Sequence, residues 1–166
     1  AADFEDDKCL TLFTQKALDW IKAREKNSPF FLYLPFTSPH KPVIPLEKFR
    51  GQGAAGAYGE FMIETDHHVG QILRTLDDEK ITNNTLVIFT SDNGPERTWV
   101  ERAKKYNHQS NGVFREGKRS IYEGGHRVPF VLRWPRKIPA NQKINVPICQ
   151  TDILATIADI IGKKLP

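Results

Sequence analysis

Apolar positions recur along the chain with two periods, and each period predicts one kind of element. Over Thr14–Lys26 the apolar residues lie three or four positions apart with charges between them, which is typical of an amphipathic helix. The same period predicts helices over about Tyr58–Glu79 and over Gln150–Gly162. The residues that define the faces of the first two helices are Ala17, Leu18 and Ile21, and Phe61, Thr65, Val69, Ile72 and Leu76.

Three short apolar runs predict strands: Phe30–Phe36, Leu86–Thr90 and Val128–Pro135. Helices and strands alternate along the chain, so an α/β fold is expected. From Gly94 to Glu123 apolar periodicity is weak, and we expect a long irregular stretch. Such stretches in compact domains are more often functional than idle.

Composition narrows the class of protein. The chain has 166 residues, 39% hydrophobic and 27% charged, which suits one soluble globular domain, and no run of about 18 apolar residues is present. Its net charge of +4 comes from scattered basic residues, which indicates a solvated basic surface or an acidic or sulfated substrate. No basic stripe with interleaved aromatic residues is present, so nucleic acid is disfavoured. Cys9 and Cys149 are predicted to be two buried thiols, with a disulfide as the alternative.

Asp92 and Asn93 stand where an apolar strand stops, followed at once by Gly94-Pro95. In open α/β sheets, ligands bind beyond the carboxyl ends of strands. Carboxylate and amide oxygens suit Ca²⁺ or Mg²⁺ better than zinc. Asp-Asn-Gly is also a common turn sequence, so local chemistry alone leaves a turn and a cation site both open.

Two more residues have suitable surroundings for chemistry on an anionic ester. Lys118 lies in a glycine-flanked loop that closes with Glu-Gly-Gly, where a lysine can neutralise an oxyanion. His40 lies between two prolines in "SPHKP" after a predicted strand, and rigid framing suits a histidine that transfers protons. Taken singly, each also fits an ordinary exposed loop residue.

Four segments follow one another along the chain in this order: "FFLYLPFTSPHKP", "NNTLVIFTSDNGPE", "GKRSIYEGGHRVPFVLRWP" and "QTDILATIADIIG". Together they resemble the sulfatase family, the arylsulfatase-like branch of the alkaline phosphatase superfamily. The resemblance implies part of an α/β/α sandwich with a mostly parallel sheet. It implies that Asp92 and Asn93 bind Ca²⁺ or Mg²⁺, that Lys118 and His40 contact the sulfate, and that His40 assists the leaving group. It also implies that Glu123 and Arg127 shape the loop.

The resemblance also shows which family features lie outside these 166 residues. The family's nucleophile is a formylglycine made in a Cys/Ser-x-Pro/Ala-x-Arg motif, and neither cysteine nor any serine here fits that pattern. Asp6-Asp7 reads as solvated acid before a helix, rather than as the family's N-terminal metal pair. Residues 1–166 are therefore expected to be a partial catalytic domain, inactive alone and needing the rest of an exported enzyme to cover its sheet edges and apolar faces.

The parent protein is expected to hydrolyse a sulfate ester of a carbohydrate or an aryl alcohol. Arg115 is a weaker substrate-binding candidate, and Trp99, Tyr106 and His108 in the same stretch are candidates for contact with a sugar or aryl ring. Two alternatives remain at this stage. One is a phosphodiesterase or phosphonate hydrolase of the same superfamily, and the other is a non-catalytic module that binds sulfated sugars.

Overall fold

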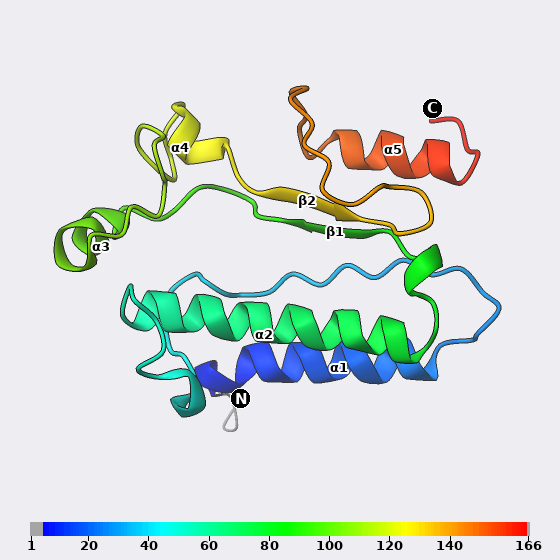
Figure 1. Cartoon of the computed structure of the whole chain (residues 1–166), viewed down its shortest axis with the longest axis horizontal. Coiled ribbons are helices and arrows are strands. Elements are labelled where there is room, and N and C mark those ends of the chain that lie inside the picture. Colours follow the sequence, from blue (N-terminus) through cyan, green and yellow to red (C-terminus); the bar gives the residue numbers. More distant parts are fainter. Residues whose placement is uncertain (1–4, 166) are drawn as a thin grey trace.

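Two long helices form the base of the molecule. The computed structural model describes residues 5–165, in which α1 (Cys9–Ala23) and α2 (Ala57–Asp78) lie side by side (Figure 1). The first predicted helix begins earlier and ends earlier than expected, whereas the second agrees to within a residue at each end. Their buried residues recur at helical spacing, and they include Leu10, Ala17, Leu18 and Ile21 on α1 and Phe61, Thr65 and Leu76 on α2.

The sheet among the described residues has two strands. β1 (Val87–Thr90) pairs antiparallel with β2 (Phe130–Arg133), with Val87 opposite Arg133 and Thr90 opposite Phe130. Two of the three predicted strands, those over Leu86–Thr90 and Val128–Pro135, are confirmed with shorter bounds, and the α/β class is confirmed. No parallel pair occurs within residues 5–165. Beyond β2, α5 (Asp152–Ile160) follows a loop and ends before Gly162, whose positive φ of 66° is favourable for glycine.

The prediction of a strand over Phe30–Phe36 is wrong, because the segment pairs with no other strand among the described residues. The segment is extended, but it belongs to no strand ladder in the described part of the chain. Its side chains still alternate as in a strand: Phe31 and Tyr33 are 72% and 77% exposed, whereas Leu32 and Leu34 are half-buried. Figure 1 shows this light-blue segment between α2 and β1. The segment therefore has the sequence pattern of a strand, but the described residues contain no neighbouring strand with which it forms hydrogen bonds.

The stretch predicted to be irregular, Gly94 to Glu123, contains the helix α3 (Trp99–Tyr106), and the short helix α4 (Glu123–His126) begins at its last residue. The sequence pattern did not predict α3 because its residues are mostly polar. Its side chain Arg102 donates hydrogen bonds to Ser110 Oγ (2.9 Å) and Thr98 Oγ1 (3.2 Å), which help to hold the helix in place. Three 3₁₀ turns complete the elements, at Asp6–Lys8, Glu47–Phe49 and Thr82–Asn84. The first contains Asp6-Asp7 and precedes α1, as expected.

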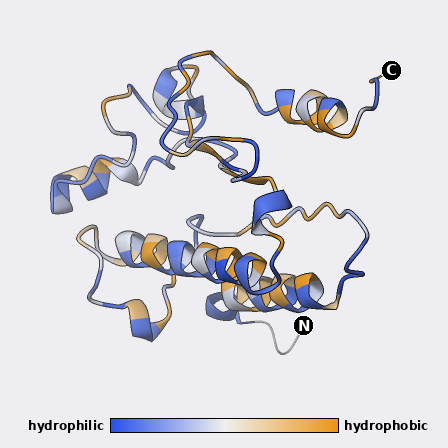
Figure 2. Ribbon diagram, turned by 45° about the vertical axis from the view of Figure 1, so that its right-hand side comes forward, coloured by the Kyte–Doolittle hydropathy of each residue, from blue (hydrophilic) through white to orange (hydrophobic). Residues whose placement is uncertain are grey.

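Two further expectations concern exposed surface. Cys9 and Cys149 are both free thiols, but the prediction that both are buried is wrong, because Cys9 is only half-buried and Cys149 is exposed. Helix α5 carries a band of hydrophobic residues (Figure 2), and Leu154 on it is 66% exposed. Between residues 5 and 165, no helix combines the length and apolar character that a membrane crossing requires.

Candidate functional site

The turn after β1 presents Asp92 and Asn93 at the end of the strand. The Ser91 hydroxyl donates to the Asn93 carbonyl oxygen (3.2 Å), and Asn93 Nδ2 donates to the Gly94 carbonyl oxygen (2.9 Å). Because the amide nitrogen is engaged in this way, the Asn93 Oδ1 oxygen remains available as a ligand. Asp92 is exposed and forms no salt bridge with any residue between 5 and 165. The turn thus offers two hard oxygen donors from adjacent residues.

This turn rests directly on the backbone of the Glu-Gly-Gly segment. Gly94 N–H donates to the Gly125 carbonyl oxygen (2.9 Å). A Cβ at Gly94 would lie 1.8 Å from the Gly124 carbonyl oxygen, and a Cβ at Gly124 would lie 2.1 Å from the Glu116 carbonyl oxygen. Only glycines permit so close an approach of two backbones. The contact therefore fixes where Asp92 and Asn93 stand relative to the loop that carries Lys118.

The Lys118 loop is also fixed by backbone hydrogen bonds. Lys118 N–H donates to the Pro95 carbonyl oxygen (2.9 Å), only two residues beyond Asn93 in sequence. Buried Asn111 holds the start of the loop, because its Nδ2 donates to the carbonyl oxygens of Phe114 (2.7 Å) and Glu116 (2.9 Å). The Lys118 backbone is therefore anchored next to the end of β1.

Positive charge gathers beside this turn. The pKa of Glu96 is lowered, first by the hydrogen bond from Arg97 N–H (3.0 Å) and then by the charges of Arg119, Lys118 and Lys41. Burial acts in the opposite direction. Lys41 follows His40, and Lys118 belongs to the glycine-rich loop. The charges of two lysines that are far apart in sequence therefore both act on the Glu96 carboxylate. The electrostatic setting favours an anionic ligand next to Asp92 and Asn93.

His40 lies on an exposed loop with one ring nitrogen engaged. Its Nδ1 is 2.8 Å from the Lys41 carbonyl oxygen. A carbonyl only accepts, so Nδ1 carries the hydrogen and Nε2 is left to exchange a proton with a ligand. The main-chain N–H of His40 donates to the Thr37 carbonyl oxygen (3.0 Å).

The structure brings four of the candidates to one cavity. They are His40, Asp92, Asn93 and His108, and the cavity, open and of about 2080 Å³, also borders the extended segment and β1. Lys118 and Arg115 do not line it; the Arg115 guanidinium lies 3.8 Å from the centre of the Tyr122 ring. Arg127 lies 2.5 Å from the Glu123 carboxylate and 4.7 Å from the centre of the Phe114 ring, which suits a role in loop structure. Within residues 5–165, no group of three or more His, Cys, Asp or Glu side chains is arranged to hold a metal.

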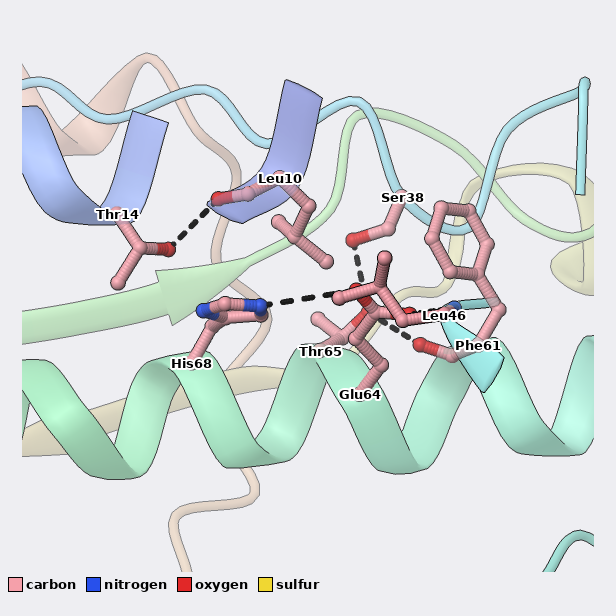
Figure 3. A network of polar contacts seen from close by, with 8 residues as sticks. All are labelled: Leu10, Thr14, Ser38, Leu46, Phe61, Glu64, Thr65 and His68. Atoms are coloured by element: carbon pink, nitrogen blue, oxygen red, sulfur yellow. Dashed lines mark hydrogen bonds and ion pairs between the residues drawn. The ribbon is translucent and has the colours of Figure 1, made fainter. Parts of the chain in front are cut away.

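A buried polar cluster on α2 escaped the sequence analysis. Glu64 is 0% exposed and His68 is 3% exposed, and Glu64 Oε1 lies 3.7 Å from His68 Nε2 (Figure 3). Burial raises the pKa of Glu64, against the hydrogen bond from Leu46, and burial lowers the pKa of His68. The signal in the sequence was their position, because residues 61, 64, 65, 68 and 72 share one helical face.

Comparisons with known proteins agree on one family. The family model described as Sulfatase matches residues 8–163. An N-acetylgalactosamine-6-O-sulfatase from Bacteroides thetaiotaomicron is 36% identical over 170 residues, covering 100% of this chain and 33% of its own length. Human steryl-sulfatase is 39% identical over 160 residues, covering 96% of this chain and 27% of its own length.

Solved structures show the same likeness in three dimensions. A Bacteroides thetaiotaomicron structure described in connection with the metabolism of multiple glycosaminoglycans superposes with a TM-score of 0.87 at 36% identity, covering 98% of this chain and 34% of that one. A sulfatase from Pseudoalteromonas sp. superposes with a TM-score of 0.81 at 28% identity, covering 96% and 32%. The chain thus spans about a third of the length of these relatives.

Proposed function

Because the chain belongs to the sulfatase family, we propose that it contributes the cation-binding and leaving-group side of a sulfuric ester hydrolase active site. The observation that supports this most is the shared cavity onto which His40, Asp92 and Asn93 open. In this proposal residues 1–166 are a portion of a larger catalytic domain. The nucleophile, a formylglycine, is expected in a segment outside these residues.

Asp92 and Asn93 fit a hard cation. Asp92 supplies an exposed carboxylate that has no ion-pair partner in the described part of the chain. Asn93 supplies its amide oxygen, because its amide nitrogen already donates a hydrogen bond to Gly94. We propose Ca²⁺, with Mg²⁺ as the alternative, completed by ligands from outside this chain. When bound, the cation would supply charge stabilisation to the transferring sulfuryl group.

The other residues act on the two ends of the ester bond. In the proposed reaction an oxygen of the nucleophile would bond to sulfur as the S–O bond to the leaving alcohol breaks. His40, protonated on both ring nitrogens, would give the Nε2 proton to the departing oxygen. Lys118 does not line the cavity, but its backbone is anchored to Pro95 beside the end of β1. In this proposal its side chain reaches the sulfate and offsets the negative charge of the sulfate oxygens. The bond between the nucleophile and sulfate would then break, with water restoring the nucleophile and a proton returning to His40. The sum is a sulfate ester plus water to an alcohol plus hydrogen sulfate.

The substrate class we propose is a sulfated carbohydrate or an aryl sulfate. The relatives are named for N-acetylgalactosamine-6-sulfate and for steryl sulfate, so the family accommodates both sugars and rings. The positive charges of Lys41, Lys118 and Arg119 near Glu96 favour a polyanionic sugar. Arg115 lies on the same loop as Lys118, where a large substrate would reach it.

The test is hydrolysis of 4-nitrophenyl sulfate and of a sulfated disaccharide by the complete enzyme. We expect loss of activity on calcium chelation and recovery on adding Ca²⁺. Asp92→Ala and Lys118→Ala should each lower kcat by about 100-fold or more, since removing one transition-state donor typically does so.

Two matched control variants distinguish the effect of removing any surface charge from the effect of removing a residue of the proposed site. Asp78→Ala and Lys104→Ala remove exposed charges at the end of α2 and on α3, and both should leave kcat within about twofold. Turnover by residues 1–166 alone, or full activity of Asp92→Ala, would overturn the proposal.

A further inference from the structure

The loop that carries His40 has few means of holding itself in place. Residues 39–45 read "PHKPVIP", and three of these seven positions are proline, which has no N–H to donate. The hydrogen bond from His40 N–H to Thr37 is the one main-chain bond that the described structure gives this loop. Its position must therefore be set from outside.

Two neighbouring side chains of α2 contact the loop on both sides of His40. The Thr65 hydroxyl lies 2.7 Å from Ser38 Oγ and 2.7 Å from the Phe61 carbonyl oxygen. A hydroxyl has one hydrogen, so Thr65 donates to Phe61 and accepts from Ser38. Beyond the loop, Glu64 Oε2 accepts from Leu46 N–H at 2.9 Å (Figure 3).

The polar contacts of Glu64 are incomplete for a buried carboxylate. The carboxylate is 0% exposed, and its Oε1 has no hydrogen-bond partner among the described residues. Its neighbour His68 likewise has no hydrogen-bond partner there for either ring nitrogen. Buried ionisable pairs of this kind are often replaceable by apolar residues without loss of stability. The well-formed hydrogen bond of Glu64 is the one that holds Leu46.

We propose that Glu64 and Thr65 are positioning residues for His40, fixing its loop at Leu46 and at Ser38 so that the imidazole faces the cavity shared with Asp92 and Asn93. The inference rests on the proposed function of His40. It adds that the rigid helix α2 sets the place of the proton donor. Neither residue touches the substrate.

The test compares two substrates in the complete enzyme. An alkyl sulfate needs its leaving oxygen protonated, whereas 4-nitrophenyl sulfate releases a stable phenolate without help. We expect His40→Ala, Thr65→Val and Glu64→Leu to lower kcat for the alkyl sulfate about 10- to 100-fold more than for 4-nitrophenyl sulfate, because a misplacement of about 1 Å can cost about 100-fold.

Conservative variants separate positioning from general damage. Thr65→Ser and Glu64→Gln keep an acceptor for the loop and should restore most of the lost rate. Thr75→Val is the matched control, because Thr75 lies on the same helix and is 5% exposed, as is Thr65. It should change both substrates equally or not at all.

The outcomes are distinguishable. If His40→Ala shows the substrate difference but Thr65→Val and Glu64→Leu do not, the positioning proposal is overturned and the proposed function stands. If His40→Ala shows no difference, the acid role of His40 fails. Crystal structures of Thr65→Val and Thr65→Ser then decide: a loop displaced only in the valine variant supports positioning, and an unmoved loop overturns it.

Discussion

Gly94→Ala is the substitution whose effect the structure fixes most directly. The new Cβ would lie 1.8 Å from the Gly124 carbonyl oxygen, whereas real Cβ contacts essentially never fall below 3.0 Å. The two backbones must therefore move apart by about 1.2 Å, the difference between these values. No flexible side chain is available to absorb the movement, because the obstacle is main chain.

The separation has two energetic consequences. Gly94 N–H and the Gly125 carbonyl oxygen, now 2.9 Å apart, would lie beyond hydrogen-bonding distance. Leaving such groups unpaired costs about 1–3 kcal/mol, and overpacking costs about 1–3 kcal/mol more. We expect the free energy of unfolding to fall by about 2–6 kcal/mol, and calcium affinity to fall with it because Asp92 and Asn93 move.

The assay is urea unfolding of the complete enzyme with a calcium titration of the folded protein. Gly70→Ala is the matched control: its Cβ would meet only the tip of Arg74 at 3.3 Å, and alanine within a helix is favoured over glycine by about 1 kcal/mol. A Gly94→Ala protein with the stability and calcium affinity of the wild type would refute the reasoning about this backbone contact.

Three further predictions concern the helices and the loop. Leu10→Ala should lower the free energy of unfolding by about 2–5 kcal/mol in urea, since Leu10 is 1% exposed. Asn111→Ala should lower it by about 1–3 kcal/mol, since two loop carbonyl oxygens lose their donor, and should lower kcat further through Lys118. Burial lowers the pKa of His68 from its ordinary 6.5, so the unfolded chain binds the extra proton and stability should fall as pH drops below about 6.5. His68→Gln should flatten that part of the pH–stability curve, and an unchanged slope would contradict the prediction. The raised pKa of Glu64 has the opposite effect: it stabilises the folded state at low pH, and this stabilisation decreases as pH rises.

Much of the fold could be predicted where one local period dominates. The helix α2 and the strands β1 and β2 follow directly from spacing in the sequence. The segment Phe30–Phe36 shows the limit of that reasoning. Its pattern predicts a strand, but a strand also needs a hydrogen-bonding neighbour, and that depends on the rest of the fold.

The candidate site was predictable in part and for different reasons. The place of Asp92 and Asn93 after a strand made them candidates, and the resemblance to a family suggested the role that we propose for them. The support of the His40 loop by Glu64 and Thr65 was not. The helical period places Thr65 on the core face but does not pair it with Ser38, and a charged residue such as Glu64 is ordinarily assigned to the solvent face of a helix. The position of Glu64 next to that core face was the overlooked signal.

The pairing of β1 with β2 has a consequence for folding kinetics. Thr90 pairs with Phe130, so Asp92, Asn93 and Lys118 all lie within one closed loop. Closing a loop of about 40 residues costs entropy before its contacts form, whereas α1 and α2 can gain helical structure locally. The turn that carries Asp92 and Asn93 should therefore assemble late and open first. In native-state hydrogen exchange, the Gly94 amide should exchange sooner than amides in the middle of α1.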